Sequence, residues 1–285
     1  MTPALIITPH SSGYIPYDIL VEMLGEAVYD SAARQARLEY LFFEGDPYTD
    51  ALFYVPGAQH VGALASRFVV DLNRSRNEDG PNGVIKLTDF SGRPLYPAGY
   101  SLSAAGVEER LARYYDPFHA SLDRALAQDD VLFFVDGHSM SPYGPLIGPD
   151  EGEPRPAFCI ITGGGPQGEP LPLGEPPSIP AEVAQEIVRL LKRHFADIIA
   201  DTQDVPDAYW INDPFALGGT HYRLSHASHP SQTPGFALEF NRGLFLRRDA
   251  SGFEETVPGR VRELNARFQQ FIGDLVPVFE ALRTY

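Results

Sequence analysis

Short apolar runs bounded by turn-forming residues recur along the chain, and each run predicts a buried β-strand. Val, Ile, Leu and Phe dominate these runs, which is the pattern of strands that are covered on both faces of a sheet. The sheet is therefore expected to be largely parallel or mixed. The predicted strands are Leu5–Thr8, Arg67–Leu72, Val131–Val135, Phe158–Thr162 and Gly235–Phe240.

Between these runs, apolar residues recur at the spacing of amphipathic helices. In the first such segment, Ile19, Leu20 and Met23 share one helical face. Pro180 suits a helix start, whereas Pro277 predicts a kink in the last helix. The predicted helices are Pro16–Arg34, Val107–Gln128, Pro180–Ile199 and Val261–Arg283. This alternation of strands and helices predicts an α/β protein with a three-layer sandwich around a mixed, mostly parallel sheet.

Length and composition favour one large domain. The chain has 285 residues, of which 44% are hydrophobic, and this is ample material for a core. We expect a single domain over residues 1–285. Two stretches, at about 77–106 and 144–180, are rich in Gly and Pro and have no clear period apart from the strand at Phe158. Long loops of this kind in a compact domain usually act as lids or as walls of a binding site.

The charge of the chain restricts its partners. Lys and Arg number 22 against 38 Asp and Glu, which gives a formal net charge of −16. This excess of negative charge argues against nucleic acid and anionic membrane surfaces as partners. An anionic substrate would need a local basic pocket. The oligomeric state is not indicated by the sequence.

The N-terminal residues and the single cysteine suggest a cytoplasmic protein. The opening residues MTPALIITPHSS lack a basic leader, and no apolar run approaches the length of about 18 residues that a membrane-spanning helix needs. Cys159 is the one cysteine, so no internal disulfide can form. It lies within the apolar run PAFCIIT, which is typical of a buried structural thiol rather than a nucleophile.

A dense group of polar residues lies in the run SRFVVDLNRSRN. Arg67, Asp71, Asn73 and Arg74 fall within eight residues of one another. Arginine forks bind carboxylates through two parallel charge-assisted hydrogen bonds, so this group suits an acidic substrate, with Asp71 orienting the arginines. The alternative is a set of structural salt bridges.

Two histidines follow predicted strands and suggest a metal site. His10 comes after Leu5–Thr8, and His138 comes after Val131–Val135. Because ligands bind at the carboxyl ends of parallel strands, the two imidazoles are expected to meet there. Two His and one carboxylate can form a catalytic zinc site with a fourth position open. The carboxylate is open among Glu44, Asp46 and Asp50, with Asp46 preferred; the alternative is a pair of non-ligating histidines.

Glu239 is a candidate for proton transfer. It lies between Leu238 and Phe240 in a predicted strand, so alternation turns its side chain away from these neighbours, towards a polar pocket or solvent. A carboxylate beside a metal-activated water can take its proton and pass it to a leaving amine. The alternative is an ion pair with Arg242.

Two further groups of residues carry candidate chemistry. A serine mechanism through Ser139 is disfavoured, since no GxSxG motif is present and adjacent side chains on a strand diverge. The spacing of the histidines in GGTHYRLSHASH fits no closed zinc motif and indicates a loop over the site, where Arg223 could supply a further positive charge. These histidines are His221, His226 and His229.

A series of short blocks resembles the N-formylglutamate amidohydrolase family, a branch of the zinc-dependent carboxypeptidase-like hydrolases. SRFVVDLNR is the most specific of these blocks, and Pro47 stands where the family usually has an aromatic residue. In family order, the blocks are PHSSGYIP, GDPYTDALF, SRFVVDLNR, GRPLYPAG, YYDPFHASL, VDGHS, GGTHYR and FALEFNRGLF, spanning Thr8 to Phe245.

The resemblance implies a carboxypeptidase-like fold and a role for each residue of the site. Zinc would be held by His10, Asp46 and His138, with Glu239 as general acid and base. Arg67 would polarise the scissile carbonyl. Asn73, Arg74 and Arg223 would bind the carboxylates of the substrate, and Asp71 would orient the arginines.

The expected reaction is the zinc-dependent hydrolysis of the N-acyl amide of a small acidic amino acid, with N-formyl-L-glutamate as the simplest substrate. Two alternatives remain. One is a zinc carboxypeptidase or a deacylase of another N-acyl amino acid or peptide. The other is a non-catalytic protein that binds carboxylates without metal.

Overall fold

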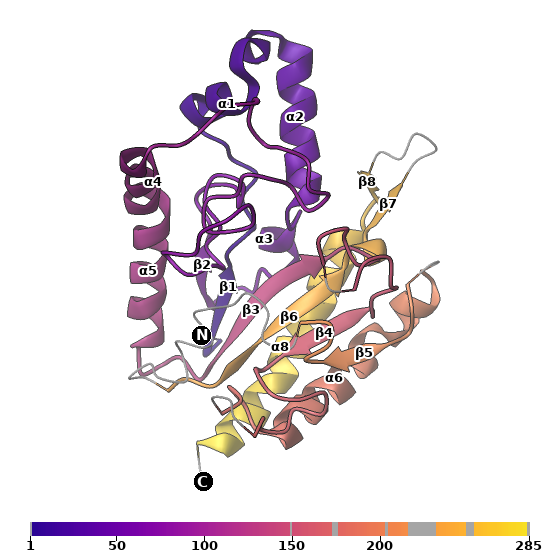
Figure 1. Cartoon of the computed structure of the whole chain (residues 1–285). Coiled ribbons are helices and arrows are strands. Elements are labelled where there is room, and N and C mark those ends of the chain that lie inside the picture. The colour runs from indigo at the N-terminus through magenta and orange to yellow at the C-terminus, as the bar shows by residue number, and fades with distance from the viewer. Residues whose placement is uncertain are drawn as a thin grey trace.

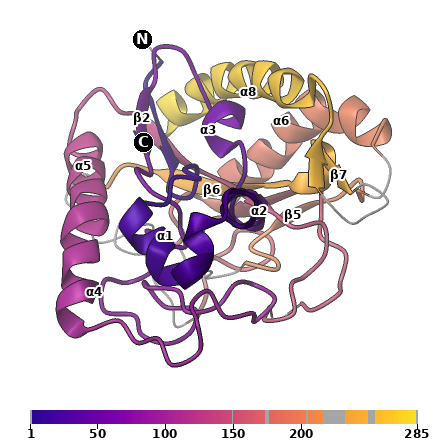
Figure 2. The same cartoon turned by 90° about the horizontal axis from the view of Figure 1, so that it is seen from above.

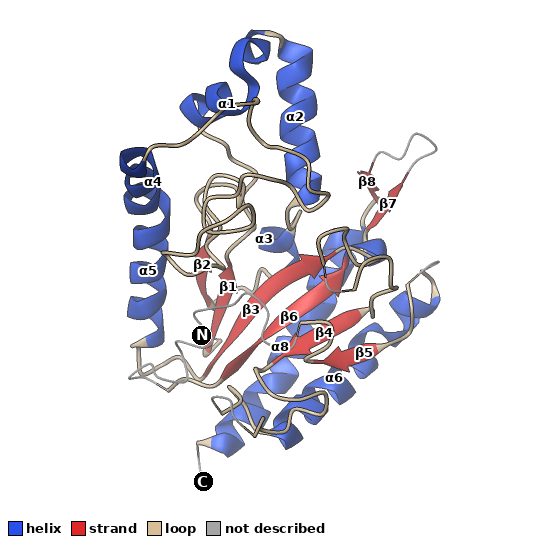
Figure 3. Cartoon of the chain, in the orientation of Figure 1, coloured by secondary structure: helices blue, strands red, loops and turns tan. Residues whose placement is uncertain are grey.

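The structure is a computed structural model that describes residues 2–148, 150–172, 176–202, 205–215, 232–248 and 254–283. Its centre is a six-stranded sheet in the order β2-β1-β3-β6-β4-β5 (Figure 1). A second sheet, the antiparallel pair β7 and β8, lies apart from it (Figure 3). The strands are β1 Ala4–Thr8, β2 Gln59–Gly62, β3 Phe133–Met140, β4 Phe158–Ile161, β5 Tyr209–Ile211, β6 Gly235–Asn241, β7 Leu246–Arg248 and β8 Glu254–Thr256.

Four neighbouring strands of the large sheet run in the same direction. β2, β1, β3 and β6 pair in parallel, whereas β4 pairs antiparallel with β6 and β5 follows β4 in parallel. The sheet is therefore mixed and mostly parallel, as the apolar runs predicted. The carboxyl ends of β1, β3 and β6 consequently lie together at one edge.

Helices cover both faces of this sheet, which makes the three-layer sandwich expected from the sequence. Figure 2 shows α3, α6 and α8 on one side of the sheet and α1 and α2 on the other. The helices are α1 Tyr17–Leu24, α2 Ser31–Glu44, α3 Thr49–Leu52, α4 Ala104–Arg110, α5 Asp116–Leu126, α6 Ala181–Ala200 and α8 Arg260–Leu282, with shorter helical turns η1 Gly25–Tyr29, η2 Leu111–Tyr115 and η3 Arg242–Leu244.

Alternation along the strands divides most of the interior into two large cores, and a third, small cluster contains Met140, Cys159, Ile161 and Ala237. In β1, Ala4 and Ile6 pack with residues of α6 and α8, whereas Leu5 and Ile7 pack with residues of α1 and α5. β3 also approaches α3 closely, because Gly137 has no side chain: a Cβ there would lie 2.5 Å from the ring of Phe53. This packing fixes the middle of β3 just before its last residues.

The predicted strand Arg67–Leu72 is wrong. This segment forms turns, in which the amide of Val69 donates to the carbonyl of Ser66 over 2.8 Å. Its apolar residues are buried all the same, since Phe68, Val69 and Leu72 belong to the core against α1 and α5. An apolar run indicates only that its residues are buried. Here they are buried in turns, without the hydrogen bonds that pair strands in a sheet.

The helix predictions hold with breaks that periodicity did not indicate. The predicted helix Pro16–Arg34 is in fact α1, which ends at Leu24, then η1, which begins at Gly25 with a φ of +57°, and then α2, which runs past the predicted end to Glu44. The segment Val107–Gln128 contains the π turn η2, and α8 runs from Arg260 to Leu282 with Pro277 inside it. Pro180 directly precedes α6, as expected. Among the described residues, no helix is both long and apolar enough to cross a membrane.

Candidate active site

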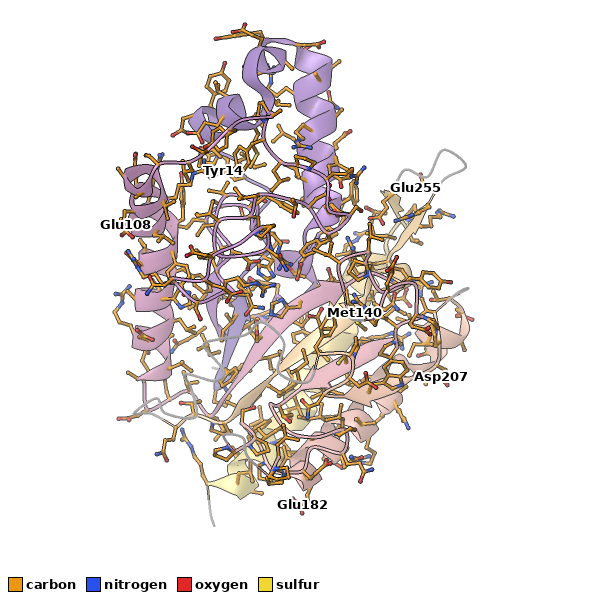
Figure 4. All side chains as sticks on the ribbon, in the orientation of Figure 1. Tyr14, Glu108, Met140, Glu182, Asp207 and Glu255 are labelled. Carbon is orange, nitrogen blue, oxygen red and sulfur yellow. The ribbon has the colours of Figure 1, made fainter. Side chains whose placement is uncertain are left out.

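The carboxyl edge of the parallel strands gathers polar side chains that the core does not need. His10 lies two residues beyond β1, and His138 and Glu239 lie near the ends of β3 and β6. Met140, labelled in Figure 4, is the last residue of β3 and lies at this edge. Asp46 reaches the same place from the turn that joins α2 to α3.

His10, Asp46 and His138 form a buried group, called the His–Asp–His cluster below. One ligand atom from each residue lies within 4.8 Å of the others, so the group could hold a metal ion. The Nδ1 atoms of His10 and His138 lie 3.3 and 3.2 Å from the same oxygen, Asp46 Oδ2. Of the three acidic candidates, Asp46 joins the histidines, whereas Asp50 is exposed.

A second carboxylate lies behind each imidazole. His10 Nε2 is 2.8 Å from Asp71 Oδ1 and forms a hydrogen bond with it. His138 Nε2 is 2.8 Å from Asp136 Oδ1, although these two atoms are not aligned as a hydrogen bond. Both carboxylates are fully buried. Each therefore favours an imidazole that carries its proton on Nε2 and leaves Nδ1 free to bind a ligand.

The donor atoms of the cluster fit a zinc ion. With the protons on Nε2, the Nδ1 lone pairs of His10 and His138 both face the carboxylate oxygen of Asp46. Three electron-rich atoms then converge in a buried space, which is unfavourable without a cation or additional protons. Two imidazole nitrogens and one carboxylate oxygen suit zinc and leave a fourth position for a water or substrate oxygen.

Asp46 and His138 have pKa values that are shifted from their ordinary ones. Burial favours the neutral form of Asp46, but His10 and Arg67 outweigh it and hold the pKa of Asp46 well below its usual range. Burial also favours the neutral form of His138, yet the adjacent Asp136 raises the pKa of His138 well above its usual value. The cluster thus keeps an ionised carboxylate beside imidazoles that are themselves held by carboxylates.

Arg67 joins the cluster to Asp71. Its Nη1 donates to Asp46 Oδ1 over 2.8 Å, and its Nη2 donates to Asp71 Oδ2 over 3.0 Å. Its guanidinium also lies over the ring of Phe90, with 4.8 Å to the centroid. Arg67 therefore contacts the cluster directly, and its two terminal nitrogens bind two different buried carboxylates.

Asn73 and Arg74 lie next to Asp71 but are held differently. Asn73 is buried, and its side-chain oxygen has no hydrogen-bond partner among the described residues. The Arg74 guanidinium donates to the backbone carbonyls of Asn82 and Asn73 over 3.1 Å each. Asp71 thus orients the side chain of Arg67, whereas the guanidinium of Arg74 is oriented by backbone oxygens and by an ion pair with Glu78, whose Oε1 lies 3.3 Å from Arg74 Nε.

Glu239 lies directly opposite His138 in the pairing of β3 with β6. Its neighbours Leu238 and Phe240 belong to the core against α6 and α8, so Glu239 points to the other face, as alternation predicted. Burial raises the pKa of Glu239 to about 7, with opposing contributions from His138 and Asp46. Arg242 does not supply the alternative ion pair: it donates to the Phe43 carbonyl and lies 3.9 Å from Glu254.

Several sequence candidates add nothing to this geometry or lie outside it. Cys159 is fully buried, and burial together with the charge of Glu239 raises the pKa of its thiol, which keeps it protonated. The loop residues Arg223, His221, His226 and His229 lie outside the described residues.

Two buried residues of the site were given no role from the sequence, although Asp136 stands out as a polar residue next to its predicted strand. Asp136 could have been found, because it precedes His138 by two residues on a strand and so shares its face. Lys86 gave no signal, since it lies in the irregular stretch 77–106, where no periodicity indicates which side chains turn inwards. Its Nζ lies 3.0 Å from Asp71 Oδ2.

Relatives of the chain come from sequence and from structure. A curated N-formylglutamate deformylase of Pseudomonas putida is 30% identical over 164 residues, which are 51% of this chain and 54% of that protein. Another from Pseudomonas aeruginosa is 32% identical over 123 residues, which are 36% of this chain and 46% of that protein. The chain thus spans about half the length of the curated relatives it matches.

Solved structures share the fold over nearly the whole chain. The crystal structure of N-formylglutamate amidohydrolase from Ralstonia eutropha JMP134 superposes with a TM-score of 0.67 at 20% identity, covering 99% of this chain and 94% of that one. Gene product Atu2144 from Agrobacterium tumefaciens gives a TM-score of 0.56 at 16% identity, with 97% and 90% covered. The family model of N-formylglutamate amidohydrolase matches residues 2–246. With most of its length inside that match, the chain belongs to the N-formylglutamate amidohydrolase family.

Proposed function

We propose that the chain is a zinc-dependent amidohydrolase that cleaves the N-acyl amide of a small acidic amino acid, most simply N-formyl-L-glutamate to formate and L-glutamate. The observation that carries the proposal is the buried His–Asp–His cluster with Glu239 and Arg67 beside it. Membership of the family and the names of the curated relatives support the same reaction.

His10, Asp46 and His138 would hold the zinc ion through two imidazole nitrogens and one carboxylate oxygen. A zinc ion in such a site lowers the pKa of a water molecule and polarises a carbonyl group. Asp71 would keep the imidazole of His10 in the ligating orientation by accepting its Nε2 proton, and the charge of Asp136, which lies 2.8 Å from His138 Nε2, would favour the same orientation of His138.

Glu239 would carry the proton of the reaction. Its pKa of about 7 lets the carboxylate take a proton from the attacking water and release it later at neutral pH. The hydroxide adds to the formyl carbon, and the C–N bond then breaks as Glu239 delivers the proton to the departing amine. Formate and free glutamate are the products, and Glu239 returns to its ionised form.

Arg67, Asn73 and Arg74 would hold the substrate. Arg67 lies against Asp46, where its guanidinium would stabilise negative charge on the carbonyl oxygen as the tetrahedral intermediate forms. Asn73 would donate from its side-chain NH2 group, and Arg74 lies beside it. Together they would bind the α-carboxylate, while Arg223 is proposed for the second carboxylate of the diacid.

Formate release from N-formyl-L-glutamate tests the proposal. The full chain is stripped with a chelator, reloaded with zinc, and compared with the stripped protein and with zinc-loaded Glu239→Gln. Release by the zinc-loaded wild type alone is the expected result. N-acetyl-L-glutamate, N-formyl-L-glutamine and a dipeptide ending in glutamate test the acyl group, the side-chain carboxylate and carboxypeptidase activity. If the zinc-loaded protein releases no formate, the proposed substrate is wrong. If the protein binds no zinc, the proposed zinc dependence is wrong.

A further inference from the structure

Lys86 is a charged residue buried where no charge is expected. Its side chain is closed to solvent, and lysine is almost never fully buried unless it is paired. Burial lowers the pKa of Lys86 to about 8, even though Asp71 opposes that shift. An ammonium group that carries such a desolvation cost needs compensating contacts.

Three contacts hold the ammonium group in place. Its Nζ lies 3.0 Å from Asp71 Oδ2 and also donates to the side-chain oxygen of Asn82. The ring of Phe90 lies beneath it, with 5.0 Å from Nζ to the centroid. The guanidinium of Arg67 also contacts this ring, so Lys86 and Arg67 share both an aromatic ring and a carboxylate partner.

The contacts of Asp71 show what Lys86 is doing there. Asp71 Oδ1 accepts from His10 Nε2 over 2.8 Å and from the amide of Asn73 over 3.0 Å. Asp71 Oδ2 accepts from Arg67 Nη2 over 3.0 Å and faces Lys86 Nζ at 3.0 Å. A carboxylate offers about four acceptor positions; three are filled by these hydrogen bonds, and the ammonium group of Lys86 lies at the fourth as an ion pair. The position of Asp71, and with it that of His10, depends on all four contacts.

We propose that Lys86 is a positioning residue that acts through Asp71 to fix His10 and Arg67 relative to each other. The inference rests on the proposed function, because His10 is taken as a zinc ligand. Among the described residues, the contacts of the Lys86 ammonium group are with Asp71, Asn82 and Phe90, and none is with a member of the His–Asp–His cluster. Without its charge, Asp71 loses one of the two cations on Oδ2, and its carboxylate can turn away from His10.

The effect should be confined to one of the two cluster histidines. His138 is backed by Asp136, for which no lysine contact is present among the described residues. His194 gives a distant reference: its Nε2 lies 2.9 Å from Asp274, between α6 and α8. A loss of order that spreads through the whole fold would affect His194 as well, whereas a positioning role predicts a change at His10 alone.

The test is the imidazole N–H proton signal of His10 in zinc-loaded protein labelled with ¹⁵N-histidine, with the signal assigned through His10→Gln. We expect a downfield signal in the wild type that exchanges slowly with solvent. Lys86→Met should remove or strongly broaden it, leaving the signals of His138 and His194 in place. Arg110→Met is the matched control, because Arg110 is another buried cation in the core against α1 and α5, where it pairs with Glu22.

Each outcome decides the matter. An unchanged His10 signal in Lys86→Met overturns the inference, as does the loss of all three signals or an equal loss in Arg110→Met. If Lys86→Met does not fold, Asn82→Ala removes one partner of the ammonium group while keeping its charge. That variant should shift the His10 signal alone, and no shift overturns the inference. A wild type that binds no zinc overturns the proposed function instead, so the two failures are distinguishable.

Discussion

His138 and Glu239 face each other directly across the pairing of β3 with β6. Both strands are parallel here, so the two side chains leave the same face of the sheet at the same level. A proposed metal ligand and the proposed proton carrier are thus held by the backbone register, which a rigid sheet keeps more precisely than a loop would.

Glu239→Gln should separate metal binding from turnover. The amide keeps the size of the carboxylate but cannot take a proton, so we expect formate release to fall by about 10²- to 10⁴-fold with the zinc content unchanged. Zinc content by elemental analysis and single-turnover formate release are the two measurements. Glu254→Gln is the control, because Glu254 is a partly buried carboxylate that pairs with Arg242. Wild-type turnover in Glu239→Gln would remove the role proposed for it.

Asp136→Asn should weaken zinc binding without unfolding the protein. The asparagine is a poorer partner for the Nε2 proton of His138, and loss of such a partner typically costs about 10- to 100-fold in metal affinity. Competition with a chelator of known affinity measures the effect. Asp89→Asn is the matched control, since Asp89 is an equally buried carboxylate that contacts Arg93 and Tyr40 instead. Equal affinities of the two variants would show that Asp136 does not support the metal.

Lys86 should make the free energy of unfolding of the metal-free protein depend on pH in the alkaline range. Its folded pKa of about 8 lies below the ordinary value of 10.5, so between these values the unfolded chain binds more protons than the folded one. Stability therefore rises with pH through this window, by about 3 kcal/mol for this group. Urea unfolding of wild type and Lys86→Met at pH 7.5 and 10.5 gives the difference in the free energy of unfolding. A difference that stays constant with pH would mean that Lys86 titrates normally.

Cys159 should be inert in the native protein. The thiol is closed to solvent, and its raised pKa keeps the reactive thiolate scarce. A thiol reagent should label the protein slowly in buffer and fast in urea, and formate release should survive treatment of the native enzyme. Rapid native labelling with loss of activity would argue for a catalytic thiol. Cys159→Ala, treated with the same reagent, controls for reaction at other side chains.

The sequence predicted the elements whose apolar residues are both dense and regular. β1, β3, β4 and β6 were found because their residues are buried on both faces, and the same density in Arg67–Leu72 produced the wrong prediction. β2 was missed because Gln59–Gly62 is partly exposed at the sheet edge and has no apolar run. Local periodicity cannot distinguish a buried turn from a buried strand when both bring apolar side chains inwards.

The candidate site could also be predicted only in part. The proximity of His10 and His138 could be predicted, because parallel strands end at a common edge. The contact between Asp71 and His10 was not predicted, since 61 positions separate them and the connection depends on how a buried turn packs. The contact of Lys86 with Asp71 could not be predicted for the same reason. Its position is set by tertiary contacts in a stretch where the sequence gives no local pattern.

The reversed direction of β4 places the long connection between β3 and β4 at one edge of the sheet. Because β4 runs antiparallel to β6, Phe158 at its start lies opposite Phe240, and Met140 at the end of β3 lies opposite Asn241. The segment between Met140 and Phe158 therefore leaves the sheet and returns to it at the same edge, next to the cluster. Such an excursion can be lengthened, shortened or exchanged without rethreading any strand. The length and sequence of this segment can thus change while the strands that carry His138 and Glu239 stay untouched.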